Sequence, residues 1–122
     1  MRDFKNLLVW RRAHALHIAI DVACRRLRQK DFANLKSQLT RAAESIPAAV
    51  VEGAGAATQP EFARYLDIAI KSANETEYHL LAAAERGALP SDRADPLMAE
   101  TVEVRRMLFG LRKRVIGDDD PS

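Results

Sequence analysis

The fold is decided by residues 58–87, which read TQPEFARYLDIAIKSANETEYHLLAAAERG. Thr58, Pro60 and Glu61 form the pattern of a capping box with proline in the first turn, which marks the start of a helix. Gly87 is a natural C-terminal stop. Between them, apolar or small residues recur at spacings of four and three, which places them on one helical face. These residues are Phe62, Leu66, Ala69, Ala73, Thr76, Leu80 and Ala83. The stretch predicts one amphipathic helix that must bury its apolar face.

Three further segments show the same helical period. In residues 9–28 the row is Leu16, Ile20, Ala23 and Leu27, extended by Trp10 and Ala13. In residues 34–53 it is Leu35, Leu39, Ala42, Ile46 and Val50. After Pro90 it is Leu97, Thr101, Val104, Leu108, Leu111 and Val115. We expect Pro47 to kink or break its helix, because proline removes a backbone donor. Ser91 or Asp95 is the expected N-cap of the last helix, and Gly117 its end.

Four helices joined by short loops predict an all-α fold, an antiparallel up-down-up-down four-helix bundle. A chain of 122 residues is enough for one domain with a real core. We therefore expect a single domain over residues 1–117. The remaining residues 118–122, DDDPS, are expected to form a disordered acidic tail.

The last helix carries a second apolar row, formed by Val102, Phe109 and Ile116. Two apolar rows are more than one bundle core needs. The row either widens the stripe that faces the core or forms an interface with another subunit. Both interpretations stay open at this point.

Positive charge is concentrated near the N-terminus. Residues 1–30 hold eight Lys or Arg against two Asp, while the whole chain has a net charge of +2. Arginine outnumbers lysine by 14 to 5, and its planar fork suits phosphate and carboxylate groups. The candidate nucleic-acid-binding residues are Arg11, Arg12, Arg25, Arg26 and Arg28 of the first helix, with Arg105, Arg106 and Arg112 of the last. No aromatic platform accompanies them, so any binding of RNA or DNA should be weak and sequence-tolerant. The alternative is that these arginines lie on solvated faces or form ion pairs.

No motif for catalysis, a cofactor or a metal is present. A single cysteine, Cys24, excludes an intrachain disulfide and a multi-cysteine zinc site. His14 and His17 lack the surrounding ligands of a metal motif, and Gly53-Ala54-Gly55 lacks the Gly-Lys-Ser/Thr of a phosphate loop. Cys24 lies beside Arg25 and Arg26, whose charges could lower the pKa of its thiol. We find no apolar run of transmembrane length and no signal peptide, and so expect a cytoplasmic protein without catalytic residues, cofactor, metal, membrane contact or small-molecule substrate.

Three stretches resemble one known family. FKNLLVWRRA at residues 4–13, SQLTRAAESIP at 37–47 followed by Glu52 and Gly53, and EFARYLDIA at 61–69 followed by Ser72 and Glu75 resemble motifs of the 23S rRNA intervening-sequence protein family, also called four-helix bundle proteins. The resemblance spans residues 4–116. It implies an antiparallel four-helix bundle that assembles into a ring, typically a homopentamer, and it brings no catalytic residues.

The resemblance also implies a connection to nucleic acid. Founding members are encoded in insertions within bacterial ribosomal RNA genes. A similar bundle is an accessory protein of diversity-generating retroelements, where a basic pentamer binds reverse transcriptase and nucleic acid. The chain departs from the family pattern at Ala49 instead of Asn, at Ala56 instead of a basic residue and at Lys71 instead of Gly. Any polar or nucleic-acid role of the first two positions is lost here.

The polar motif residues are expected to pair between the second and third helices. If the turn is centred near Thr58, Arg41 and Glu75 lie 17 residues on either side of it, and Glu52 and Arg64 lie six on either side. An antiparallel hairpin brings such residues to the same level. The predicted structural network consists of Arg41, Ser45, Glu52, Arg64, Ser72 and Glu75.

Three functions are compatible with these observations. The leading hypothesis is a non-enzymatic homo-oligomer that serves as a scaffold or binding protein, with weak nucleic-acid binding or an adaptor role toward a nucleic-acid enzyme. The first alternative is an oligomer with protein contacts only, whose arginines form salt bridges. The second is an enzyme with an unrecognised site between subunits, which would require a deep pocket with converging polar groups.

Overall fold

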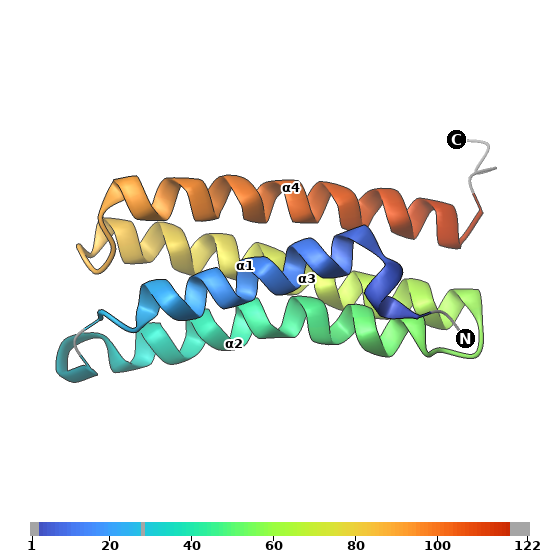
Figure 1. Ribbon diagram of the computed structural model, residues 1–122, viewed down its shortest axis with the longest axis horizontal. Helices are drawn as coiled ribbons and strands as arrows, with labels where there is room; N and C mark the ends of the chain where they lie inside the picture. Colours follow the sequence, from blue (N-terminus) through green and yellow to red (C-terminus); the bar gives the residue numbers. More distant parts are fainter. Residues whose placement is uncertain (1–2, 28, 118–122) are drawn as a thin grey trace.

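The helix signals of the sequence are followed closely by the computed structural model, which describes residues 3–27 and 29–117 (Figure 1). The order is a short 3-10 helix η1 (Phe4–Asn6), then α1 (Leu8–Cys24), α2 (Gln29–Ala54), α3 (Gln59–Glu85) and α4 (Ser91–Val115). At the start of α3, the Thr58 hydroxyl accepts a hydrogen bond from the Glu61 backbone N–H at 3.2 Å. Gly87 and Gly117 follow α3 and α4 with φ values of +75° and +85°, in the left-handed region that favours glycine.

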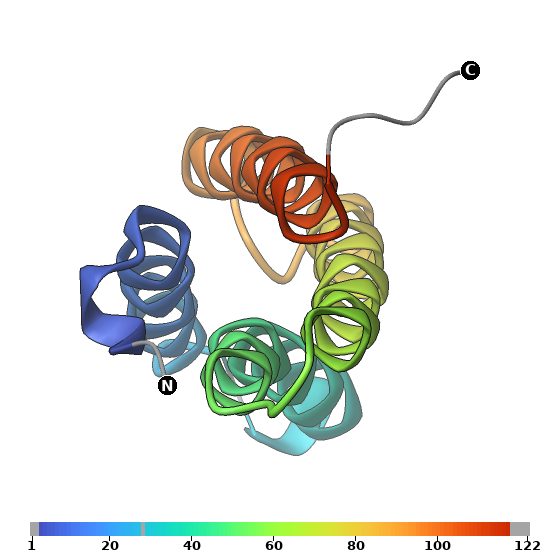
Figure 2. The same ribbon diagram turned by 90° about the vertical axis from the view of Figure 1, so that its right-hand side faces the viewer.

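The four long helices form an antiparallel up-down-up-down bundle, which confirms the predicted fold class. Seen end-on, they follow one another around the bundle in chain order (Figure 2). Contact is most extensive between α2 and α3 and least extensive between α1 and α4, where the first and last helices complete the circle. The bundle therefore has one tight hairpin at its centre and one loosely closed side.

Close packing of α2 on α3 depends on Gly53. A Cβ atom at this position would lie 2.7 Å from Cδ1 of Phe62 and 3.0 Å from Cβ of Tyr65. Real Cβ atoms do not approach another atom as closely as 2.7 Å, so a side chain at Gly53 would force the Phe62 ring or the helices to shift. Phe62 itself is fully buried. The absent side chain of one helix thus makes room for the largest core residue of the next.

The predicted core rows are largely buried. All seven residues of the α3 row are buried, as are the predicted rows of α2 and of α4 apart from the half-buried Leu97. In α1 the buried row is Val9, Ala13, Leu16, Ile20 and Cys24. Thr76 and Thr101 are buried polar residues, and each hydroxyl donates to a backbone carbonyl one turn earlier in its own helix. Buried hydroxyls are tolerated because these bonds satisfy them.

Three local expectations were wrong. The first helix ends at Cys24, before the expected residue 28, and Arg28 lies outside the described residues. Helix α2 continues through the buried Pro47, so the expected break there is wrong, and its non-helical residue is Phe32, with φ −132° and ψ 24°. Packing on both α1 and α3 holds the helix together at proline, which costs about 3 kcal/mol in an ordinary helix interior.

At the start of α4, neither predicted cap residue has that role. The N-cap position is Pro90, no side chain caps the helix, and Asp95 with Pro96 lies inside it. The predicted acidic tail, residues 118–122, lies outside the described residues.

Candidate functional site

The second row of α4 does not face the core. Val102, Phe109 and Ile116 are 41%, 55% and 48% exposed. Of the two interpretations of this row, burial within the chain's own core is therefore wrong. The row remains an unpartnered apolar surface on the outside of the bundle.

A matching row on α1 was missed by the sequence analysis. Leu8, Ile18 and Val22 are also large exposed hydrophobic residues, and the exposed Ala15 lies between them. Their spacing of seven, three and four was a readable signal, but the neighbouring buried row of the same helix obscured it. Two more large exposed hydrophobic residues, Tyr78 and Leu81, lie on α3, whereas the described residues of α2 include no exposed hydrophobic residue larger than alanine. The apolar surface is confined to three of the four helices.

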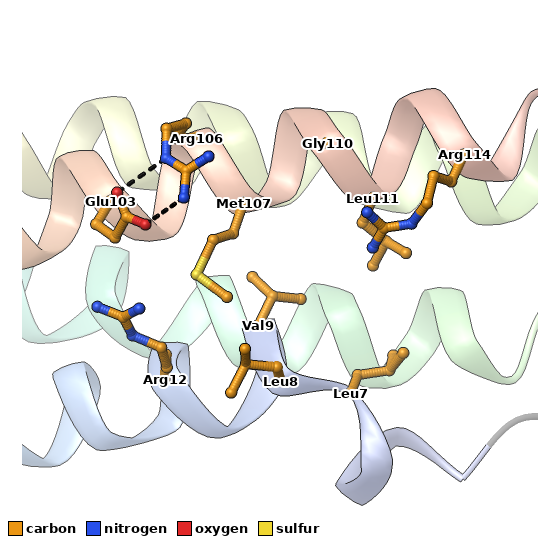
Figure 3. Close-up of a pocket in the computed structure, with 10 residues that line it drawn as sticks. All are labelled: Leu7, Leu8, Val9, Arg12, Glu103, Arg106, Met107, Gly110, Leu111 and Arg114. Carbon is orange, nitrogen blue, oxygen red and sulfur yellow. Dashed lines mark hydrogen bonds and ion pairs between the residues drawn. The ribbon is translucent and has the colours of Figure 1, made fainter. Parts of the chain in front are cut away.

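A pocket of about 330 Å³ lies where α1 approaches α4 (Figure 3). Its walls include apolar side chains from both helices and from the segment before α1, among them Leu7, Leu8, Met107 and Leu111. Gly110 also lines it, and a Cβ atom there would meet nothing within 4 Å. Packing within the described chain therefore gives no reason for a glycine in the middle of this helix.

Charged groups lie at both ends of the same pocket. Arg12 reaches from α1 to α4, where its Nη2 and Nε lie 2.6 Å and 3.0 Å from the two carboxylate oxygens of Glu100. On α4, Arg106 forms a two-pronged pair with Glu103, and its hydrogen bonds hold the pKa of Glu103 below the usual value. Arg114 lines the pocket without an ion pair to any described residue. The α1–α4 contact thus combines apolar packing with ion pairs.

Four of the seven candidate nucleic-acid-binding arginines that the structure describes are engaged in ion pairs. Besides Arg12 and Arg106, Arg105 of α4 bonds to Glu77 at 2.6 Å and to the Asn74 side chain at 2.8 Å. Arg112 bonds to Asp67 at 2.6 Å. Each pairing leaves less net positive charge for phosphate. Arg11, Arg25 and Arg26 remain exposed and without an ion pair among the described residues.

The predicted network between α2 and α3 is formed only in part. Ser45 and Ser72 share a hydrogen bond of 2.8 Å between their hydroxyls. Arg41 and Glu75 lie at the same level, as the hairpin geometry predicts, but the described residues contain no ion pair of either one. No ion pair joins Glu52 to Arg64 in this part of the chain. The Arg64 guanidinium instead lies 4.6 Å from the centre of the Tyr65 ring.

What forms at this place is a polar hollow of about 340 Å³ along the α2–α3 groove. Both serines line it together with Arg41 and Glu75. Gln38, Ala42 and His79 complete the lining. Sequence analysis found four of these seven residues from the motif resemblance.

His14, His17 and Cys24 each lie against neighbouring side chains of the bundle. The His14 ring stacks on Trp10 with centroids 5.0 Å apart, and His17 Nε2 lies 3.9 Å from the Asp21 carboxylate. Cys24 is fully buried, and burial, helped by Asp21, raises the pKa of its thiol to about 11. The expectation that neighbouring arginines could lower this pKa was wrong, because desolvation dominates.

The described residues contain no group of three or more His, Cys, Asp or Glu side chains placed to hold a metal ion. None of the helices described is both long and apolar enough to cross a membrane.

Comparison with known proteins agrees with this architecture. The chain is an all-α, antiparallel four-helix bundle. Over residues 5–110 it matches the family model of the 23S rRNA-intervening sequence protein, and it belongs to that family. It is also similar to the crystal structure of a protein with unknown function, from the S23 ribosomal protein family of Bacteroides thetaiotaomicron. That match has a TM-score of 0.79 and 25% sequence identity, and it covers 87% of this chain and 99% of the other. No curated protein matches the chain.

Proposed function

We propose that the protein is a non-enzymatic homo-oligomeric scaffold of the cytoplasm, assembled through the apolar rows of α1 and α4. The observation that carries the proposal is the set of exposed hydrophobic residues on these two helices, Leu8, Ile18, Val22, Val102, Phe109 and Ile116. Burial of apolar surface is the main driving force of protein association. Exposed hydrophobic residues gathered into rows are typical of an interaction surface.

The two rows lie on different helices, so the simplest contact is between unlike surfaces. The α1 row of one subunit then packs on the α4 row of the next. A contact between unlike surfaces closes into a ring when the rotation between subunits allows it. The family resemblance suggests five subunits. A closed ring would bury both rows of every subunit, whereas a two-fold dimer formed through one row would leave the other exposed.

The test is to block each row separately and then to mix the variants. Ile18→Glu and Phe109→Glu each place a charge in one row, and we expect each to reduce the assembly to a smaller species by sedimentation velocity. In the mixture, the intact α4 row of Ile18→Glu meets the intact α1 row of Phe109→Glu. We therefore expect a one-to-one dimer to form only on mixing.

The matched control is Ala48→Glu, which adds the same charge to an exposed site on α2 and should leave the assembly unchanged. A wild-type chain that sediments as a monomer at every concentration would refute the oligomer. Wild-type assembly without recovery on mixing would refute the contact between unlike rows.

Weak nucleic-acid binding is a second candidate function, supported by the exposed Arg11, Arg25 and Arg26, which form no ion pair with the described residues. Ring assembly would repeat this small positive surface in every subunit and so strengthen the attraction for phosphate. The ion pairs of Arg12, Arg105, Arg106 and Arg112 instead support the alternative of an oligomer with protein contacts only.

A mobility-shift titration over salt distinguishes the two functions. If nucleic acid binds, affinity should fall steeply with salt, because each phosphate contact contributes about 0.7–0.9 to the slope of log K against log salt. Replacing Arg25 and Arg26 by Gln should lower that slope by more than replacing the paired Arg112. Absence of binding at low salt would leave the scaffold alone.

A further inference from the structure

The polar hollow between α2 and α3 has the arrangement of a small binding site. Three polar residues of α2 and three of α3 line it from the two sides of the groove. Ser45 contacts Ser72 at one end. From this contact, the antiparallel register places Arg41 level with Glu75 in the middle and Gln38 level with His79 at the other end. The hollow of about 340 Å³ falls within the range of about 300–1,000 Å³ that is usual for ligand pockets.

Its inner end is built to donate a hydrogen bond. Ser45 and Ser72 share a hydrogen bond of 2.8 Å, which uses one of their two hydroxyl hydrogens. The other hydroxyl hydrogen is left for a further acceptor. Ser72 is only 7% exposed, so its hydroxyl lies at the bottom of the hollow rather than in bulk water. Beside it, Ala42 is 6% exposed and has no more than a methyl group to occupy the space.

The middle of the hollow holds two opposite charges that do not meet. Arg41 and Glu75 are both exposed, and neither has an ion pair among the described residues. Across the neighbouring α3–α4 groove the same kind of residues do meet, because Arg112 contacts Asp67 at 2.6 Å. On the α2–α3 side, the guanidinium and the carboxylate both remain able to bind a group of opposite charge.

We propose that the hollow binds a compact zwitterion with one carboxylate and one primary ammonium group, the class to which the free α-amino acids belong. The planar guanidinium of Arg41 pairs with the carboxylate, and the spare serine hydroxyl donates to one of its oxygens. Glu75 accepts hydrogen bonds from the ammonium group. Gln38 and His79, at the far end, contact the side chain of the ligand and limit its size.

The charges of the hollow argue against simpler ligands. A phosphate or sulfate ion would gain Arg41 but would lie close to the negative charge of Glu75. An organic cation would gain Glu75 and be repelled by Arg41. A zwitterion satisfies both groups at once, because its two charges are opposite to those of Arg41 and Glu75. This inference depends neither on assembly of the chain nor on nucleic-acid binding.

Proton–nitrogen correlation NMR spectra of the wild-type protein provide the test. Glycine, serine and glutamine are the probes, and acetate and methylammonium are controls that carry one charged half each. We expect amide shifts at Ser45, Ser72 and their helical neighbours with at least one amino acid. Its affinity should exceed that of either half by about tenfold or more, since each lost charged hydrogen bond is worth roughly that factor.

Variants then assign the binding to the two charges. Arg41→Gln and Glu75→Gln should each weaken the amino acid about tenfold or more, for the same reason. Glu44→Gln and Lys71→Gln change exposed charges on the same two helices outside the lining and should leave affinity unchanged. All four positions are exposed, and unchanged circular dichroism would show that each variant is folded. The proposal is refuted if none of the three amino acids shifts these amides, if acetate binds as well as the amino acid, or if binding survives both hollow variants.

Discussion

The α2–α3 hairpin differs from helices α1 and α4 in where its large apolar residues lie. In the hairpin, the large apolar residues are buried or half-buried apart from Tyr78 and Leu81 of α3. Close packing there requires a glycine, because Phe62 occupies the space beside Gly53. On α1 and α4, large apolar residues lie outside the bundle, and Gly110 has no neighbour that explains it. The hairpin therefore specifies the fold of one chain, while the exposed apolar rows of α1 and α4 are available to a second chain.

The largest expected effect on stability distinguishes two phenylalanines, one in each region. Phe62→Ala should lower the free energy of unfolding by about 3–5 kcal/mol, because a fully buried ring is replaced by a cavity. Phe109→Ala removes a ring that is 55% exposed and should cost the single chain much less. If Phe109 lies in a subunit contact, its loss should instead weaken the dependence of stability on protein concentration.

Denaturant unfolding at several protein concentrations separates these outcomes. Phe62→Ala should shift the midpoint by a similar amount at every concentration. Equal losses for both variants, with no dependence on concentration, would contradict the distinction between core and interface.

Two glycines give the next comparison, with effects of opposite sign. Gly53→Ala should destabilise the chain by about 1–3 kcal/mol, because the new Cβ overlaps Phe62 and the buried ring or the two helices must shift. Gly110→Ala has free space and a better helix former, so the folded chain should gain about 0.5–1 kcal/mol. Thermal unfolding of the two variants under dilute conditions is the measurement. A loss at Gly110 similar to that at Gly53 would show that α4 is closely packed where the pocket lies.

The thiol of Cys24 reports on how completely the core at the end of α1 excludes water. Its pKa in the folded chain is raised from 9.0 to about 11, so the unfolded chain loses the proton first as pH rises. Stability is therefore unaffected well below pH 9 and declines between pH 9 and 11, by at most about 1.4 kcal/mol per pH unit. Cys24→Ala should abolish this component when the two proteins are unfolded in urea across that range. An identical slope in the variant would mean that other groups produce the decline.

Much of the fold could be predicted from local signals, because helix caps and the apolar period depend on residues close in sequence. The cap at Thr58 and the buried row that starts at Phe62 are examples. Partners far apart in sequence could not be predicted in this way. Arg12 forms its ion pair with Glu100, which is 88 residues away in sequence, and this contact depends on how α1 and α4 lie against each other.

The hollow between α2 and α3 shows the same limit within the candidate site. Counting from the turn placed Arg41 and Glu75 at one level, which is where they lie. Whether the two side chains touch depends on the width of the groove, and the sequence separation from the turn does not determine that width. The sequence therefore predicts four of the seven residues that share the site, but not that the site is an open hollow instead of an ion pair.

The smallest expected effect concerns the ion pairs that tie α4 to its neighbours. Arg112 and Asp67 join α4 to α3, with side chains 34% and 46% exposed. A double-mutant cycle of Arg112→Gln and Asp67→Asn should give a coupling of about 0.2–1 kcal/mol, because water screens a partly exposed pair. The coupling should shrink as salt is added. A larger, salt-independent value would mean that the pair is shielded from water in solution, as it would be under a neighbouring subunit bound to α4. In that case, the same cycle measured in the Phe109→Glu background should give the small value again.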